Sequence, residues 1–568
     1  MRSTRGYIAA ILLFSIAGLC PGCGAKRSAS EYADAYRRYA SLAVKLCAEI
    51  EPLRASRLGI SSSDSLLFTY SEDEIRGALA KSQRLLKRFS SIPAGRLNGG
   101  DTDRATVIID WLRGVRFAFD GFDSFRWNPF LYCWTAEEAL WVMPSRIEPP
   151  YSGELEAYRK RILRIPSLFS NAAAHLKDPA EWHARYAIDE LDTLAAGLPA
   201  LAALVRQRYG TSLDGELATV RQSILDFRRF ISDTLIPTSH GKFIIGSENL
   251  SKIFLYGEHL NVDPNVLIAE GEKQVKRLEN EKSSILKRIE LEHQGILQAR
   301  PAAAPLNNES FESRLQRLLG DLGPAGGGSS PFGRVRGVRA TSSFPARPEY
   351  LSRSLKAPYL SIPPAGDRIA AAVTSLFSAP ACQSRLALSA GASRIGDDAL
   401  RFALLCAAPR MLETDRLRCE AKDTTAVLFS SATFEDGWRY VALLDLGPQI
   451  KKDNPELYIL VLDDWRAEYA RMVVVFSLHA GTMTSDGAIR YLMESLNMSR
   501  ETAEREVIAA SVSPAVAYPA ISMIMIEDML KNISYVFGSG KPHEELTKLL
   551  RRSRDIPLSM ITPKTQSD

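Results

Sequence analysis

Apolar residues recur every three to four positions along most of the chain, with charged residues between them. Near the N-terminus this spacing links Tyr32, Tyr36, Tyr39, Ala43, Leu46 and Ile50. The period predicts an amphipathic helix, with Ser30 as its N-cap and Pro52 as its stop. Segment 263–294 repeats the pattern, with Asp263 as cap and Pro264 at the first helical position. A further capped helix is expected from Ser499. The chain is therefore predicted to be mainly α-helical.

Four short apolar segments favour strands instead. They are KFII at 242–245, APYLSI at 357–362, LYILVL at 457–462 and RMVVVF at 471–476. The last two are equally compatible with a buried helix, because periodicity does not separate a buried strand from a buried helix. We expect a mainly α fold with a few short strands.

One stretch rich in Gly, Ser and Pro, at 299–356, interrupts the helical pattern. Such a composition is typical of a flexible connection. It divides the chain into an N-terminal helical half, 34–298, and a C-terminal helical half, 357–561.

The N-terminus has the features of a bacterial lipoprotein signal. Arg2 and Arg5 precede a short apolar run at 8–20, and Cys23 follows the small residue Gly22. We predict a signal peptide at 1–22, lipidation of Cys23 and a tether at 23–33. Cys20 stands where such signals usually carry an aliphatic residue, so ordinary signal cleavage stays an alternative. The expected location is the bacterial cell envelope, with the membrane as a partner through the lipid.

Composition excludes some classes of function. The chain has 568 residues, is 46% hydrophobic and carries a net charge of +5. So small a charge on so long a chain does not indicate a nucleic-acid binder. The remaining cysteines are odd in number and read as buried thiols rather than a disulfide framework. The seven histidines include no pair four residues apart, and no H-E-x-x-H, G-x-S-x-G or Walker sequence occurs.

Several segments, in order, resemble the bacterial family called domain of unknown function 885, whose members are helical and zinc-metallopeptidase-like. The resemblance spans roughly 34–561. It is carried by WNPFLYCW (127–134), YRKRILRIPSLFSNAAAHL (158–176), GKFIIGSENLSKIF (241–254), EDGWRYVALLDLG (435–447), FSLHAGTMTSDGAIRYLMES (476–495) and PHEELTKLLRRSRDIPLSMI (542–561). It implies a large two-lobed, gluzincin-like helical fold with a central cleft.

The zinc motif of that family, H-E-x-x-P-G-H-H, is degenerate here. LCAAPRML at 405–412 keeps Pro409 and falls where the motif is expected. Leu405 stands at the first histidine, Cys406 at the glutamate, and Met411 and Leu412 at the last two histidines. Leucine and methionine do not hold zinc in such sites.

Some polar residues near the expected site remain. Asp436 takes the place of a family glutamate, Glu435 precedes it, and His479 is kept, while Tyr518 lies two places from a family tyrosine. A metal site rebuilt from Cys406, Glu435, Asp436 and His479 is one alternative. Cys406 as a nucleophile with His479 as its base is another, against a plain buried cysteine.

The sequence favours an exported, lipid-anchored pseudopeptidase. We expect it to have lost its zinc site, to use no cofactor and to bind a peptide-like or other small ligand in the retained cleft. The first alternative is an active zinc-dependent peptidase with a rearranged metal site, and the second is a structural envelope lipoprotein.

Overall fold

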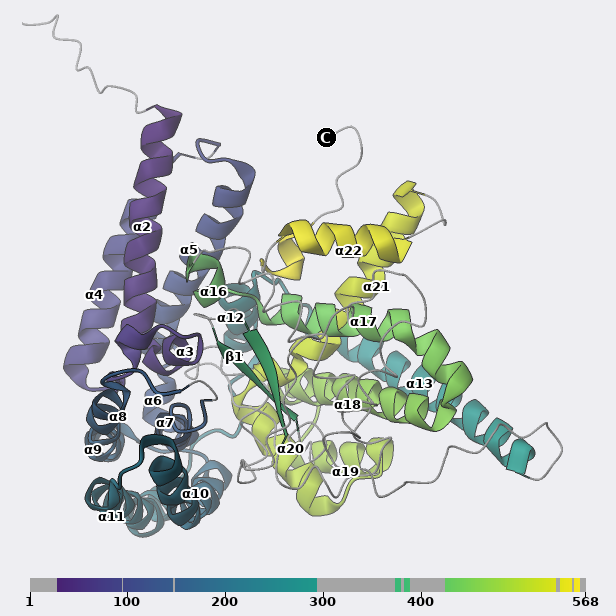
Figure 1. The fold of residues 1–568 in the computed structure, drawn as a ribbon. Coiled ribbons are helices and arrows are strands. Elements are labelled where there is room, and N and C mark those ends of the chain that lie inside the picture. The colour runs from purple at the N-terminus through teal and green to yellow at the C-terminus, as the bar shows by residue number, and fades with distance from the viewer. Residues whose placement is uncertain are drawn as a thin grey trace, which may run out of the picture.

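The computed structural model describes residues 28–93, 95–146, 149–293, 373–378, 383–388, 424–537, 542–553 and 556–561. Helices make up most of this part of the chain (Figure 1). The predicted mainly α class is thereby confirmed.

The elements before the predicted connection are all helical. They are α2 (Ala29–Ile50), α3 (Pro52–Arg57), η1 (Ser61–Ser63), α4 (Glu72–Phe89), α5 (Gly99–Asp120), α6 (Ser124–Trp127), α7 (Phe130–Trp141), α8 (Glu154–Ile162), α9 (Ile165–His175), α10 (Glu181–Tyr209), α11 (Asp214–Phe230), η2 (Ile231–Leu235), η3 (Ile236–Thr238), α12 (Ser247–Glu258) and α13 (Pro264–His293).

The later elements begin with a β-hairpin and continue as helices. In the hairpin, Val373 lies opposite Leu388 in an antiparallel pair. The elements are β1 (Val373–Ser378), β2 (Gln383–Leu388), α16 (Thr424–Leu428), α17 (Ala432–Asp453), α18 (Pro455–Ala480), α19 (Ser485–Leu496), α20 (Arg500–Val512), η6 (Pro514–Ala517), α21 (Tyr518–Phe537), α22 (Pro542–Ser553) and η7 (Leu558–Met560).

Two large hydrophobic cores hold these helices together, and a small third cluster joins α7 to α20. The first lies among α2 to α11, and the second among α12, α13 and α17 to α22. In Figure 1 the two groups stand side by side, purple and blue beside green and yellow. The cores do not divide at the connection that the sequence suggests, because α13 packs on α18 while Leu428 and Phe429 join the first core.

The contact between α13 and α18 depends on a glycine. A Cβ placed on Gly271 would lie 2.6 Å from Cγ2 of Val473 and 3.4 Å from the carbonyl oxygen of Tyr469. The glycine therefore lets the two helix backbones approach closely.

The predicted helix starts are confirmed at two sites and corrected at one. Asp263 accepts a hydrogen bond from the Asn265 amide, and Ser499 accepts one from the Thr502 amide. The N-cap of α2, however, is Ser28 and not Ser30. Ser28 forms a capping box with Glu31, so the helix begins within the range predicted as a tether.

The strand predictions fare differently. Residues 242–245 form no strand, because the Ile245 amide donates to the ring of His479 rather than to a neighbouring strand. Segments 457–462 and 471–476 both belong to α18, which resolves the ambiguity in favour of a buried helix. Segment 357–362 lies outside the described residues. Cys47 and Cys133 are buried free thiols, as expected.

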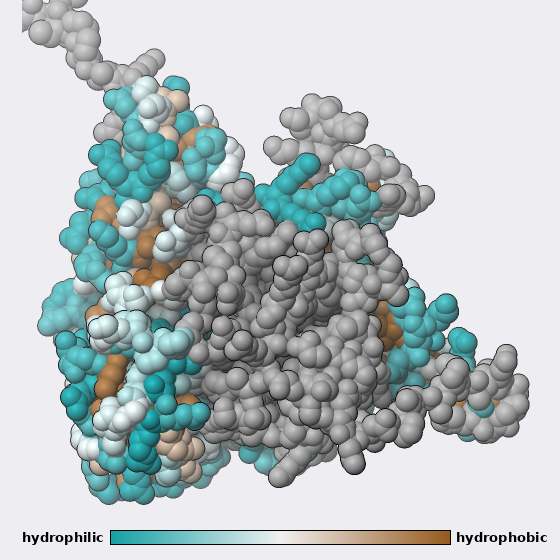
Figure 2. All heavy atoms as spheres, viewed as in Figure 1, coloured by the Kyte–Doolittle hydropathy of each residue, from teal (hydrophilic) through white to brown (hydrophobic). Residues whose placement is uncertain are grey.

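The described part of the face seen in Figure 2 is mostly polar. Figure 2 shows hydrophilic residues over the outer N-terminal helices and α22, with small hydrophobic patches between them. Within the described ranges no single helix has the length and apolarity to cross a membrane. The bent pair Arg500–Val512 and Pro514–Tyr535, which turns by 109°, meets that test jointly.

Candidate functional site

The residues predicted for the site fall in two groups. Leu405, Cys406, Met411 and Leu412, and also Cys23, lie outside the described residues. Glu435, Asp436, His479 and Tyr518 are placed by the structure, on α17, α18 and α21. The contacts and burial of these four residues, with the pKa of His479 and Tyr518, indicate which chemistry they can support.

The start of α17 is fixed by a carboxylate from another part of the chain. Glu258, at the end of α12, accepts hydrogen bonds from the amides of Ala432 at 2.7 Å and Thr433 at 3.2 Å. Ser431 caps the same helix by accepting from the Phe434 amide. These contacts satisfy amides that a helix start leaves without partners, and a negative charge is favourable there. The turn that carries Glu435 and Asp436 is therefore held firmly.

Glu435 and Asp436 are both buried, with 6% and 8% of their surfaces exposed. Ser430 donates to Glu435 at 3.4 Å. Asp436 lines a cavity of about 10 Å³ together with Arg439 and Asp464. A cavity of that size holds about one water molecule.

A group of buried charged side chains on α17, α18 and α20, which the sequence analysis does not predict, includes these two carboxylates. Arg471 reaches Glu506 with two hydrogen bonds of 3.1 Å and lies 3.4 Å from Glu468. Arg439 pairs with Asp464 between α17 and α18. We call these residues the charge cluster: Glu435, Asp436, Arg439, Asp464, Glu468, Arg471 and Glu506. Side chains of this kind are rarely buried unless they are paired.

A weak sequence signal for the cluster exists in α18. Asp464, Glu468 and Arg471 stand at i, i+4 and i+7, so they share one face of a helix. Trp465, Tyr469 and Met472 stand beside them, so the three charges lie in a largely apolar segment, although Asp463 and Arg466 are charged as well. The sequence pattern does not predict that these three charged residues are buried, nor which residues of α17 and α20 they pair with.

His479 occupies a separate environment. Its Nδ1 accepts from the Ile245 amide at 3.3 Å, so Nε2 donates to the Ala510 carbonyl at 3.0 Å. Burial lowers the pKa of His479 to about 4, although the Ala510 hydrogen bond acts in the opposite direction. At neutral pH the ring is uncharged and both nitrogens are engaged.

A second buried histidine lies close to His479. Ser511 donates to the Ile508 carbonyl, so the ring of His183 donates from Nε2 to the Ser511 hydroxyl at 2.8 Å. The ring stacks on Phe243 with centroids 5.2 Å apart. Burial, with a further contribution from His479, lowers the pKa of His183 to about 3. These neutral rings join α10 to α18 and α20 and have a structural role.

Tyr518 lies in a third environment. Its ring meets Phe254 edge-on at 5.4 Å, and its hydroxyl lies beside Gly257 of α12. Burial, and secondarily the carboxylate of Glu258, raise the pKa of Tyr518 well above its usual value. The phenol therefore stays protonated and does not serve as a base.

The described residues do not fit a zinc site. The contacts of His479 and Tyr518 involve neither Glu435 nor Asp436. Within the part of the chain that the structure describes, no three His, Cys, Asp or Glu side chains are arranged to hold a metal ion. Zinc requires several N, S or O donors converging on one point.

Comparison with known proteins supports the family resemblance over part of the chain. The model of the family described as bacterial protein of unknown function (DUF885) matches residues 52–320. The metallopeptidase-like character and the zinc motif concern later residues and are not covered by this match. No curated protein matches the sequence.

Two solved structures share the fold. A candidate lipoprotein of unknown function from Shewanella oneidensis is 13% identical, with a TM-score of 0.65 over 93% of this chain and 98% of that one. A candidate lipoprotein from Colwellia psychrerythraea is 11% identical, with a TM-score of 0.62 over the same shares of the chains. At these identities the likeness shows a common fold and does not show a common activity.

Proposed function

We propose that this protein is an exported, lipid-anchored relative of helical metallopeptidases that has lost its zinc site and acts by binding a peptide-like ligand. The observation that carries the proposal is the hydrogen bonding of His479. Both ring nitrogens of this retained histidine are bound to backbone groups of other segments. Ligation of a metal would require breaking at least one of these buried hydrogen bonds, at a cost of about 1–3 kcal/mol.

The sequence at 405–412 supports the same proposal. Leu405, Met411 and Leu412 replace the imidazoles that the resemblance calls for, and Cys406 replaces the base. Asp436 faces a cavity with room for about one water molecule, next to Arg439. Among the described residues, no three His, Cys, Asp or Glu side chains are arranged to hold a metal ion.

Metal content tests the loss of the zinc site. The mature protein is stripped with a chelator, supplied with zinc and assayed for bound metal and for hydrolysis of a peptide library. We expect far less than one zinc per chain and no chelator-sensitive turnover. An Asp436→Asn, His479→Gln double variant is the matched control and should have the same metal content. Stoichiometric zinc in the parent that the double variant loses would instead establish the active peptidase.

A thermal-shift screen tests the proposed binding of a peptide-like ligand. A ligand that binds only the folded state raises the unfolding temperature in proportion to its concentration and affinity. We expect at least one peptide of the library to stabilise the protein saturably, in the presence of a chelator. Uniform lack of stabilisation across peptides and small metabolites would favour a purely structural envelope protein.

Lipid anchoring rests on the signal-like N-terminus and Cys23, and it agrees with the description of the two structural relatives as candidate lipoproteins. Growth with a labelled fatty acid should label the wild type and not Cys23→Ala. Cys47→Ala is the control, because Cys47 is buried within α2. Label that persists in Cys23→Ala would refute the anchor.

A further inference from the structure

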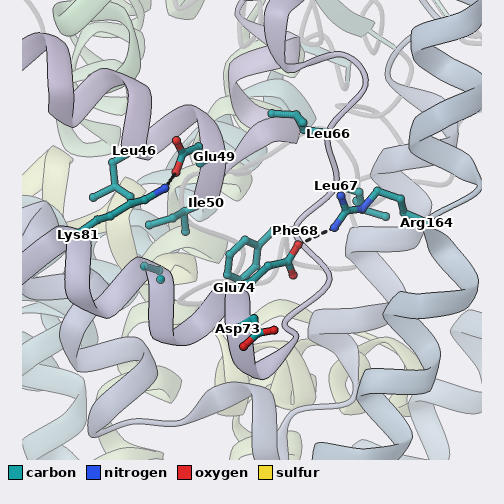
Figure 3. Close-up of a pocket in the computed structure, with 12 residues that line it drawn as sticks. Leu46, Glu49, Ile50, Leu66, Leu67, Phe68, Asp73, Glu74, Lys81 and Arg164 are labelled. Carbon is teal, nitrogen blue, oxygen red and sulfur yellow. Dashed lines mark hydrogen bonds and ion pairs between the residues drawn. The ribbon is translucent and has the colours of Figure 1, made fainter.

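A pocket of about 230 Å³ opens in the N-terminal half, far along the chain from the residues discussed above. It lies between α2, α4 and the segment 66–68 (Figure 3). Leu46, Ile50, Leu67 and Phe68 form its apolar floor. For scale, an engineered apolar cavity of about 150 Å³ in another protein holds benzene. The floor therefore has room for a side chain of leucine or phenylalanine size.

The floor is widened by a small residue. Gly77 lies on α4 in the wall of the pocket, and a Cβ placed there meets no atom within 4 Å. Glycine lowers helix stability by roughly 1 kcal/mol relative to alanine. Alanine at position 77 would fit and would favour the helix, but it would fill part of the pocket. Glycine therefore leaves the pocket larger at some cost in helix stability.

The two ends of the pocket carry different ion pairs, as Figure 3 shows. At one end, Glu74 holds Arg164 through Oε1 at 2.6 Å, while its Oε2 accepts from the Thr69 amide and hydroxyl at 2.8 Å. This carboxylate is saturated and serves as a fixed wall.

At the other end, Glu49 of α2 pairs with Lys81 of α4. Their side chains are 50% and 48% exposed, so water screens the attraction. Exposed pairs of this kind contribute about 0–1 kcal/mol. Either partner is therefore free to exchange its contact for one with a ligand at little cost.

From this arrangement we propose that the pocket binds a free α-amino acid with a large apolar side chain. The side chain lies on the floor of Leu46, Ile50 and Phe68. The α-carboxylate of the ligand pairs with Lys81, and its α-ammonium pairs with Glu49. The two opposite charges of an amino acid are adjacent, as are those of Lys81 and Glu49. The pocket is smaller than those that enclose drug-sized ligands, about 300–1,000 Å³, which suits an amino acid.

This site is independent of the proposed loss of zinc, since all its residues lie between 46 and 164. The two ideas are tested separately. An intact amino-acid site says nothing about metal content, and an active zinc centre would leave the pocket unchanged.

Calorimetric titration of the mature protein with L-leucine and L-phenylalanine tests the proposal. We expect saturable binding that weakens at least tenfold for the N-acetyl and the amide derivatives, each of which lacks one charge. Equal affinity for the derivatives, or no saturable binding of either amino acid, would overturn the proposal. Tighter binding of a dipeptide than of both amino acids would also overturn it, in favour of a peptide site.

Variants locate the binding. Lys81→Met and Glu49→Gln should each weaken binding at least tenfold, and Gly77→Leu should abolish it by filling the pocket. Lys87→Met is the matched control, because Lys87 is exposed on the same helix and does not line the pocket. Circular dichroism verifies that each variant is folded. If the three pocket variants bind as the wild type does, the site is elsewhere and the proposal fails.

Discussion

The charged residues around the pocket and those of the charge cluster are paired in similar ways but differ in their access to water. Lys81 and Glu49 are each about half exposed, whereas Arg471 and Glu506 show 6% and 1% of their side chains to solvent. Screening makes the first pair weak and exchangeable. Burial makes the second pair hard to separate, since either charge alone would lie in a low-dielectric interior.

The contrast indicates different roles for the two regions. At the Glu49–Lys81 end of the pocket, the side chains retain the freedom to change partners, as ligand binding requires. In the charge cluster, each arginine is locked between helices, so α17, α18 and α20 are fixed relative to one another. A region built in this way suits a scaffold more than a centre where charges form and move.

The largest expected effect comes from removing one side of a buried pair. Arg471→Met would leave Glu468 and Glu506 buried without this partner. We expect the free energy of unfolding, measured with urea, to fall by about 3–5 kcal/mol.

Arg500→Met is the control for this change, since Arg500 pairs with Glu504 on the exposed side of α20. It should cost at most about 0.5 kcal/mol. A loss below about 1 kcal/mol for Arg471→Met would show that the cluster is more hydrated than its burial indicates.

The free energy of unfolding should also depend on pH through the buried histidines. In the unfolded chain His479 has its ordinary pKa of 6.5, whereas in the folded protein burial lowers the pKa of His479 to about 4. Stability is therefore full above pH 6.5 and falls as the pH drops towards 4, by roughly 3 kcal/mol from this residue. His183 should add a decline of the same sign.

His479→Gln isolates this contribution. The glutamine amide retains one donor and one acceptor for Ala510 and Ile245, so the variant should fold. Its unfolding free energy, measured by urea titration from pH 7 to pH 4, should decline less steeply than that of the wild type. Parallel profiles would mean that His479 titrates normally in the folded protein.

The sequence predicted the helices better than the buried polar groups. Capped helix starts at Asp263 and Ser499 were found because the signal is local, within three residues of each cap. The strand prediction for KFII at 242–245 is wrong, because the Ile245 amide bonds to His479, which lies 234 positions away in the sequence. The apolar runs of α18 stayed ambiguous because a helix buried on nearly all sides loses its amphipathic period.

Because sequence signals are local, the sequence predicts neither the charge cluster nor the N-terminal pocket. Arg471 and Glu506 are 35 positions apart, and charged residues in a sequence are normally assigned to the surface. The pocket combines Leu46, Gly77 and Arg164 from separate elements, and a cavity arises only when these elements pack. His479 and Asp436 are predicted from the sequence as polar residues near the expected site, but their environments depend on tertiary contacts that the sequence does not reveal.

A smaller effect is expected at the start of α17. Thr433→Val removes one of the donors to Glu258 and keeps the shape of the side chain. Because three other donors to this carboxylate remain, we expect a loss of about 1–2 kcal/mol in urea unfolding. Thr219→Val, at an exposed position on α11, should change stability by less than about 0.5 kcal/mol. Equal effects of the two changes would remove Glu258 as a stabilising contact.

The smallest change in stability should come from the pocket itself. Lys81→Met breaks the pair with Glu49 but leaves that carboxylate in contact with water, so the free energy of unfolding should change by less than about 1 kcal/mol. A double-mutant cycle with Glu49→Gln measures the coupling directly. A coupling above about 2 kcal/mol would place this pair in the same class as Arg471 and Glu506. It would then be too costly to exchange for a ligand, and the contrast between the two regions would disappear.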